Sequence, residues 1–351
     1  KDFEDETIDG DVKYHLGLTI SKTLKNNKEL KMNLVPNPSH LETVGPIVEG
    51  ITRARIDKTY GGNNSKILPI IVHGDAAIAG QGLVYEVTQM SKLPGYSTGG
   101  TIHIVVNNQI GFTTNYLDAR SSTYCTDVAK VTLSPVLHIN ADDAEAVVHA
   151  VEMALEYRMR FKRDVYIDLL GYRKYGHNEG DEPRFTQPKL YKEIAKHPNP
   201  LDIYTDKLIS EKTIDKEYAD TKVESFKALL ENEFAKSKEE HNSKVREFRE
   251  ERWKGFQRKG LEEMLDGVDT SYQKEKLEKI AKVVSTVPKG VKFLRKAEKD
   301  SKEAEKAATE APKQEKTEEA PKTEKVAKEP KVEKTKEAPK TEKVAKEPKV
   351  E

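Results

Sequence analysis

The stretch from Ile67 to Phe112 constrains the fold of this chain more than any other part of the sequence. It opens with an apolar run at Ile67–Val72 and closes with a second β-type run at Thr101–Val106. Between the two runs, residues 76–90 carry apolar residues at helical spacing. Because a strand, a crossover helix and a second strand of this length form a parallel, right-handed unit, the sequence predicts an α/β fold with a Rossmann-like, mainly parallel sheet.

Polar residues follow each of these two predicted strands. Asp75 comes after the first strand, and Asn107 and Asn108 come after the second. Open α/β sheets bind ligands at the edge where the carboxyl ends of their strands meet. The Asp75 carboxylate, the Asn108 amide oxygen and the backbone carbonyl of Ile110 are hard oxygen ligands of the kind that Mg²⁺ prefers. The predicted helix adds free backbone N–H groups that favour a diphosphate.

Each of these residues also has a simpler interpretation when it is taken alone. Asp75 would be a helix cap, and the two asparagines would form a turn. Their placement after two adjacent strands favours a joint magnesium site.

Two more strands are predicted at Val136–Ile139 and Val165–Leu170, with a helix between them. Residues 140–143 form its cap. Apolar residues then follow the i, i+3/i+4 pattern at Val147, Val148, Val151, Leu155 and Met159.

Two loops are candidates for function. Thr113–Lys130 is polar and has little periodicity, and structureless loops of this length are usually functional or disordered. The loop after Val165–Leu170 carries His177 near Gly176 and Gly180, where a histidine suits phosphate binding or proton transfer. The alternative for His177 is an ordinary loop histidine whose hydrogen bonds are satisfied.

The N-terminal part predicts a hairpin with strands Leu16–Thr23 and Glu29–Val35, and then a helix at Leu41–Asp57. Ser39 and His40 would then lie at a helix N-terminus, which favours anions. The simpler alternatives are an N-cap for Ser39 and a structural hydrogen bond for His40.

Composition excludes several classes of protein. The 351 residues carry no net charge, whereas nucleic-acid binders usually have a basic surplus. No apolar run approaches the ~18 residues needed to span a bilayer. Cys125 is the only cysteine, so a disulfide framework and a cysteine-based metal site are excluded. Because the first residue is Lys1, we interpret the chain as a fragment or a processed form.

The C-terminal half is organised differently. We predict a diphosphate-binding α/β domain at residues 1–203, a charged helical extension at 204–296 and a disordered tail at 297–351. The tail repeats EAPKTEKVAKEPKVE at 319–333 and 337–351 and offers no apolar face. The extension has one apolar stripe and a predicted aromatic anchor at Trp253–Phe256, and the stripe consists of Val223, Phe226, Leu229, Leu230 and Phe234.

The Gly-Asp and Asn-Asn pairs together resemble the motif with which thiamine-diphosphate enzymes bind magnesium. Longer segments resemble the thiamine-dependent first (E1) component of the 2-oxoglutarate dehydrogenase complex from about Gly10 to about Lys296. These segments are DVKYHLG, NPSHLE, HGDAAIAGQG, GYSTGGTIHIVVNNQIGFTT, DARSSTYCTDVAK, INADDAEAV and GHNEGDEP.

The resemblance implies a thiamine-diphosphate-binding fold and oxidative decarboxylation of 2-oxoglutarate, with succinyl transfer to a lipoyl group in the tricarboxylic acid cycle. It implies thiamine diphosphate and Mg²⁺ as cofactors, with Mg²⁺ held by Asp75, Asn108 and Ile110. Ser39, Leu41, Ala76 and His177 would line the cofactor. His15, His40 and His177 would be the catalytic residues, and His15 and His40 would meet the substrate.

The implied partners are dihydrolipoyl succinyltransferase with its lipoyl domain, dihydrolipoyl dehydrogenase and a second copy of the chain. Neither nucleic acid nor a membrane is expected as a partner. The implied location is the bacterial cytoplasm or the mitochondrial matrix.

The chain departs from the family pattern in two places. A His-Arg segment that precedes DVKYHLG in the family and the domain with the glutamate that activates the cofactor are both missing from this sequence. We therefore expect an incomplete catalytic subunit. The alternatives are a truncated, non-catalytic interaction module of the complex and a relative that acts on 2-oxoadipate.

Overall fold

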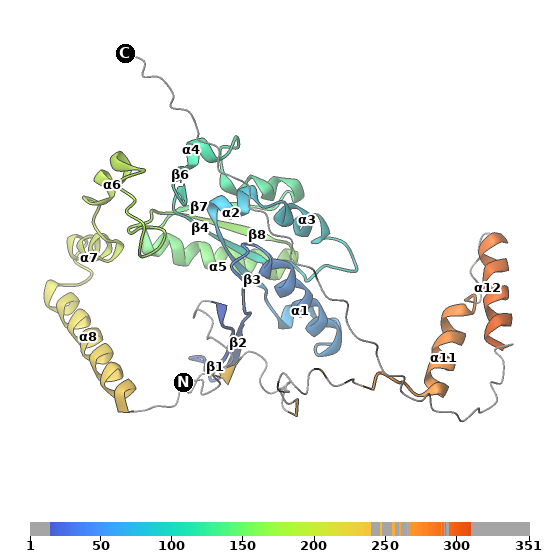
Figure 1. Ribbon diagram of the computed structural model, residues 1–351. Coiled ribbons are helices and arrows are strands. Elements are labelled where there is room, and N and C mark those ends of the chain that lie inside the picture. The colour runs from blue at the N-terminus through green and yellow to red at the C-terminus, as the bar shows by residue number, and fades with distance from the viewer. Residues whose placement is uncertain are drawn as a thin grey trace, which may run out of the picture. The chain divides into compact units, whose positions relative to one another are not determined.

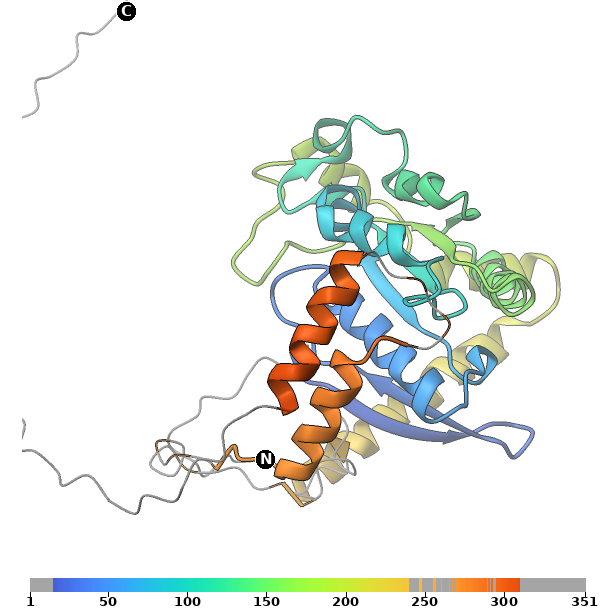
Figure 2. The same cartoon turned by 90° about the vertical axis from the view of Figure 1, so that its right-hand side faces the viewer.

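The computed structural model describes most of the first 239 residues and shorter parts of the remainder. Contacts between residues divide the chain into two units, residues 1–257 and 258–351, and each is described by itself (Figure 1 and Figure 2). The described residues are 15–239, 246–247, 255–256, 260, 265, 267, 269–288, 290, 292 and 295–309.

A four-stranded parallel sheet forms the centre of the first unit, in the order β3-β4-β8-β7. Ile102 of β4 pairs with Ile70 of β3 on one side and with Val165 of β8 on the other. The sheet confirms the predicted α/β, mainly parallel fold. Its strands are β3 (Ile70–Gly74), β4 (Ile102–Asn107), β7 (Val136–Asn140) and β8 (Val165–Leu170).

Strand β3 begins three residues later than predicted and continues through His73 and Gly74. Pro69 has no N–H group to donate, although its carbonyl accepts a hydrogen bond from Ile102 N. The carbonyl of Ile67 accepts one from the Arg158 side chain. Because β3 continues through Gly74, Asp75 is the first residue after the strand.

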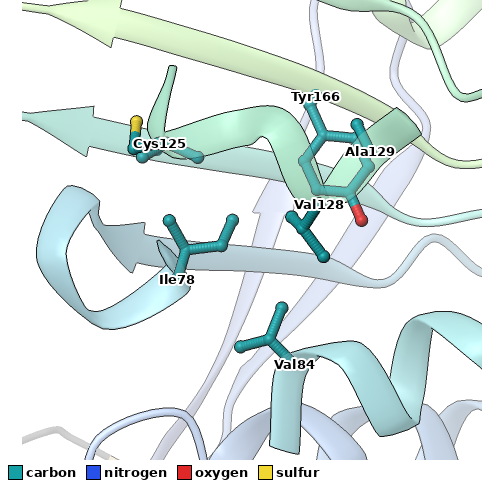
Figure 3. Packing of buried hydrophobic residues seen from close by; sticks show 7 residues of the cluster. Ile78, Val84, Cys125, Val128, Ala129 and Tyr166 are labelled. Carbon is teal, nitrogen blue, oxygen red and sulfur yellow. The ribbon is translucent and has the colours of Figure 1, made fainter. Parts of the chain in front are cut away.

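One face of the sheet is covered by α2 (Asp75–Gly80), α3 (Gly82–Met90) and the 3-10 helix η3 (Cys125–Thr132). The prediction of one helix over residues 76–90 is wrong, because Gln81 is extended between two glycines, the poorest helix formers after proline. Figure 3 shows the packing beneath these helices. The hydrophobic cluster on this face of the sheet consists of Ile78, Val84, Val105, Cys125, Val128, Ala129 and Tyr166.

The opposite face is covered by α5 (Ala144–Phe161), which begins at the predicted cap with Asp143 accepting a hydrogen bond from Ala146 N (Figure 1). Of the predicted apolar stripe on this helix, only Val147 packs against the core. Small residues, Ala150 and Ala154, lie on the sheet instead, and Arg158 is fully buried. The other stripe residues are exposed by about 40 to 60%: Val148 59%, Val151 43%, Leu155 42% and Met159 39%.

The predicted N-terminal hairpin is present as β1 (Leu18–Thr23) and β2 (Glu29–Leu34), which pair antiparallel. A two-residue strand, β9 (Arg246–Glu247), pairs with the free side of β1. Helix α1 (Val44–Lys58) starts three residues later than predicted. Glu42 has φ +70°, which a helix does not accommodate, so Ser39 and His40 lie before the helix and not at its N-terminus.

The segment predicted to be a polar loop at residues 113–130 is largely structured. After the short pair β5 (Ile110–Gly111) and β6 (Thr114–Asn115) come α4 (Tyr116–Ala119) and η3. In this segment, the apolar residues Cys125, Val128 and Ala129 are spaced to bury one side of η3 against the sheet. The segment as a whole is polar, so this pattern is not evident from its composition.

Three helices follow the sheet. Helix α6 (Pro188–Ile194) and the start of α7 (Pro200–Ser210) lie before residue 204, and the rest of α7 and α8 (Lys216–Glu239) lie in the described part of the predicted extension. The predicted apolar stripe lies on α8, and its side chains are exposed; for example, Phe226 is 59% exposed. Of the predicted anchor, Gly255 and Phe256 are described, whereas Trp253 lies outside the described residues.

The described part of the second unit contains α11 (Lys274–Ser285) and α12 (Arg295–Thr309), and Ser301 of α12 donates a hydrogen bond to the carbonyl of Ser285. Helix α12 extends into residues 297–309 of the predicted tail. Lysine, glutamate and alanine are good helix formers, and Lys299 and Glu303 form an i, i+4 ion pair at 3.6 Å. Residues 310–351 lie outside the described part, so the proposed domain limits stay a prediction.

Within the described residues, no helix has the length and apolar character to cross a bilayer.

Candidate functional site

Asp75 lies at the centre of the predicted site. Strand β3 ends at Gly74, so Asp75 becomes the first residue of α2, and it is 3% exposed. The backbone N–H groups of Ala76 and Asn108 lie near its carboxylate and lower its pKa. The structure therefore brings together residues from the ends of β3 and β4, as the sequence predicted.

The two asparagines at the end of β4, Asn107 and Asn108, form the turn that was the simpler interpretation. The Asn107 side-chain oxygen accepts from Gln109 N, and that of Asn108 accepts from Ile110 N, both at 3.2 Å. Gln109 is left-handed, with φ +64°. An amide oxygen has two lone pairs, so this turn leaves Asn108 one lone pair for a ligand.

Strand β5 lies against the start of α2. A side chain at Gly111 would place its Cβ 2.8 Å from the Cβ of Ala76, so glycine permits this close approach. Asp75, Ala76, Asn108 and Ile110 consequently lie in one small region. Helix α2 has six residues, so the dipole expected from a long helix over 76–90 is not available here.

A buried arginine accompanies Asp75. The Arg120 Nη1 atom lies 3.7 Å from Asp75 Oδ2, and the two side chains are 9% and 4% exposed. The guanidinium stands 5.3 Å from the centre of the Tyr116 ring. Burial raises the pKa of Asp75 above its usual value, and the positive charge of Arg120 opposes that rise.

The candidate metal ligands are one carboxylate, one amide oxygen and one backbone carbonyl. Groups of three or more His, Cys, Asp or Glu side chains that could hold a metal are absent from the described part of the chain. The predicted site is of a different kind, because it draws only one ligand from those four residue types.

A second group of predicted site residues lies before α1. Ser39 Oγ and His15 Nε2 are 3.2 Å apart, so the structure brings these two residues together. His40 and Leu41 are exposed, and the His40 carbonyl accepts a hydrogen bond from Thr43 Oγ1 at 2.8 Å.

Glu42 connects this turn to the sheet. Its Oε2 lies 2.6 Å from His73 Nδ1, and His73 Nε2 lies 3.0 Å from His103 Nδ1. His103 stacks on Tyr166 with ring centres 4.2 Å apart. Burial lowers the pKa of His103 well below its usual value, which keeps this ring neutral. A buried polar row therefore runs from the turn across β3, β4 and β8.

His177 lies on an exposed loop, where its backbone N–H donates to Asp181 Oδ2 at 2.8 Å. Its ring makes an edge contact with Phe112, with ring centres 4.6 Å apart. Arg173 donates to the Phe112 carbonyl at 2.8 Å, which fixes the same loop to the chain after β5. The structure thus places His177 next to the segment that carries Ile110.

Sequence reasoning missed a buried polar cluster below the same sheet edge. Asp168 of β8 accepts from Asn107 Nδ2 and contacts His138 Nδ1, each at 2.9 Å. Cys125 lies beside it, and burial raises the pKa of the thiol to about 12. The sequence does contain a pattern that indicates this cluster, because Asp168 interrupts an otherwise apolar strand, VYIDLL. Arg120 was also missed, although it stands in a quoted motif.

Comparison with known proteins adds independent findings. The sequence profile of the family described as "Dehydrogenase E1 component" matches residues 6–246. The mitochondrial 2-oxoglutarate dehydrogenase of Dictyostelium discoideum is 45% identical over 284 residues, which cover 80% of this chain and 27% of that protein. The 2-oxoglutarate dehydrogenase E1 component of Azotobacter vinelandii is 52% identical over 224 residues, 64% of this chain and 24% of that protein. The chain therefore spans about a quarter of the length of these relatives.

Proposed function

The chain belongs to the dehydrogenase E1 component family, and on that basis we propose that it forms the diphosphate-binding part of a 2-oxoglutarate dehydrogenase. The proposed reaction is oxidative decarboxylation of 2-oxoglutarate with thiamine diphosphate and Mg²⁺. The succinyl group would pass to the lipoyl group of dihydrolipoyl succinyltransferase. The identity of 52% to an E1 component with this name supports the substrate.

One observation carries the cofactor assignment. The Asn108 backbone N–H lies close enough to the Asp75 carboxylate to lower its pKa, so oxygen atoms from two neighbouring strand ends lie near one another. A carboxylate, an amide oxygen and a nearby backbone carbonyl of Ile110 fit Mg²⁺, which prefers oxygen ligands and commonly shares its shell with phosphates. Asp75, Asn108 and Ile110 would hold the metal.

The other residues would bind and orient the two ligands. Ala76 borders Asp75, and Ser39 and Leu41 would line the cofactor from the turn before α1. His177 is exposed on its loop and can donate to a phosphate oxygen. When bound, thiamine diphosphate supplies the carbanion and electron-sink chemistry that amino acids lack.

The substrate would be met by His15 and His40. Ser39 can hold the His15 ring in one orientation through their 3.2 Å contact. An imidazolium at either position would stabilise a substrate carboxylate or a developing oxyanion.

The proposed partners are those that the family resemblance implies, and the name E1 component of one relative supports a place in a multienzyme complex. They are dihydrolipoyl succinyltransferase, dihydrolipoyl dehydrogenase and a second copy of the chain. Because one relative is named mitochondrial and another is bacterial, the proposed location is the mitochondrial matrix or the bacterial cytoplasm.

Calorimetry with thiamine diphosphate and Mg²⁺ tests this proposal on the full chain. Asp75→Ala removes a charged metal ligand, and we expect Mg²⁺-dependent binding to be lost. Asp57→Ala is a matched control, because Asp57 is half exposed and pairs only locally with Arg53 in the described structure. Equal affinities for Asp75→Ala and the unaltered chain would contradict the metal assignment, and absence of binding to the unaltered chain would contradict the cofactor site.

A further inference from the structure

Arg120 is a buried cation with unused hydrogen-bond donors. Its side chain is 9% exposed, and its Nε and Nη1 atoms have no hydrogen-bond partner among the described residues. Buried polar groups are nearly always paired, and leaving a charged one without a partner destabilises the folded state. These two donors therefore require an acceptor that the described part of the chain does not provide.

Arg158, a fully buried arginine, shows how the protein usually satisfies such a side chain. Arg158 is 0% exposed, and its guanidinium donates to three backbone carbonyls. Arg158 is thus satisfied by the protein itself. Arg120 has one carboxylate nearby, Asp75, at a distance of 3.7 Å that exceeds a hydrogen bond.

The charges around Arg120 indicate the kind of acceptor. The backbone N–H groups of Ala76 and Asn108 already act on the Asp75 carboxylate, which in the proposed function also binds Mg²⁺. One carboxylate cannot neutralise both a divalent cation and a guanidinium. A metal-loaded site would carry a surplus of positive charge, which a phosphate group neutralises. A guanidinium suits this role because its fork of N–H donors matches two oxygens of one phosphate.

We propose that Arg120 is a diphosphate-binding residue, and that its Nε and Nη1 donate to phosphate oxygens of the cofactor beside Asp75. This inference rests on the proposed cofactor site. Arg120 supplies the hydrogen bonds that the six-residue helix α2 is too short to provide as a helix terminus. This role also explains why the Arg120 guanidinium is buried next to Asp75, a candidate metal ligand.

Calorimetry on the full chain with Mg²⁺ and either thiamine diphosphate or inorganic diphosphate tests the inference. Arg120→Met keeps the aliphatic stem and removes the charge, and we expect affinity for both probes to fall about 10- to 100-fold. Arg120→Lys keeps the charge but loses the fork, so we expect an intermediate loss. Arg184→Met is the control, because Arg184 is exposed and pairs with Glu182.

The melting temperature without ligand separates binding from a structural role. If Arg120 awaits a ligand, Arg120→Met removes two buried donors that lack a hydrogen-bond partner in the described structure, and the ligand-free chain should melt at the same or a higher temperature. A marked decrease would identify Arg120 as a structural partner of Asp75 and overturn the inference. Unchanged affinity in Arg120→Met would overturn it while the proposed function stands. If the unaltered chain binds neither probe, the proposed cofactor site fails and the inference fails with it.

Discussion

Arg158 is the residue whose replacement should destabilise the first unit most clearly. It lies in the last turn of α5 and donates to the carbonyls of Gly100 and Ile67 at 2.9 Å and of Thr98 at 3.3 Å. It also acts electrostatically on two buried carboxyl groups, Glu49 and Asp164. We consider Arg158→Met, which retains the aliphatic stem and removes the guanidinium.

The magnitude follows from what the substitution leaves behind. Three carbonyls lose a charged donor, and removing one member of a buried charge network typically destabilises a protein by about 3–5 kcal/mol. For a unit of this size, a loss of about 4 kcal/mol lowers the melting temperature by roughly 8–16 °C.

The loss of stability caused by Arg158→Met should depend on pH. Burial raises the pKa of Glu49 and of Asp164, and Arg158 counteracts that rise in both. A carboxyl group with a raised folded-state pKa lowers stability as the pH rises through that pKa. Without Arg158 both pKa values rise further, so Arg158→Met should lose more stability at pH 7.5 than at pH 5.

Thermal unfolding followed by near-ultraviolet circular dichroism measures this effect, because the signal reports buried tyrosines such as Tyr166. Arg160→Met is the matched control: Arg160 is two residues away, exposed, and placed 5.3 Å over the Phe161 ring. It should change stability by no more than about 0.5 kcal/mol. A loss below about 1 kcal/mol for Arg158→Met, or a larger loss at pH 5, would refute the reasoning.

Two further predictions concern the site. Gly111→Ala would place a methyl group 2.8 Å from the Ala76 Cβ, so β5 must move away from α2. Calorimetry should then show weaker Mg²⁺-dependent binding of thiamine diphosphate. Unchanged affinity would mean that this contact does not position Ile110. Burial raises the pKa of Cys125 to about 12, so at pH 8 the folded chain should resist iodoacetamide while the urea-unfolded chain reacts. Rapid labelling of the folded chain, followed by mass spectrometry, would show that the thiol is accessible.

The sheet and the meeting of Asp75 with Asn108 could be predicted because they depend on local patterns and on general rules. Continuous apolar runs identify buried parallel strands, and the parallel direction of the strands places both carboxyl ends at one edge. The short hairpin of β1 and β2 was predictable for the same kind of reason, since it depends on neighbouring residues.

The face of α5 that packs against the sheet could not be predicted from the apolar residues of the helix. Val148, Val151, Leu155 and Met159 form the more hydrophobic stripe, yet Ala150 and Ala154 allow the helix to approach the sheet closely. Arg120 and Arg158 were missed for a related reason, because arginine is usually exposed and its burial depends on distant partners. The Ile67 carbonyl, for example, lies 91 residues from the arginine that it binds.

The contact between Glu42 and His73 has a consequence for peptides and grafted motifs. The left-handed backbone at Glu42 is unfavourable by about 1–3 kcal/mol for a residue of this kind. The partner that holds it, His73, lies 31 residues further along the chain, on a strand that must first pair with β4. A synthetic peptide with the NPSHLE segment therefore lacks the interaction that fixes its shape. Transplanting this turn into another scaffold would require His73 and His103 to be transplanted with it.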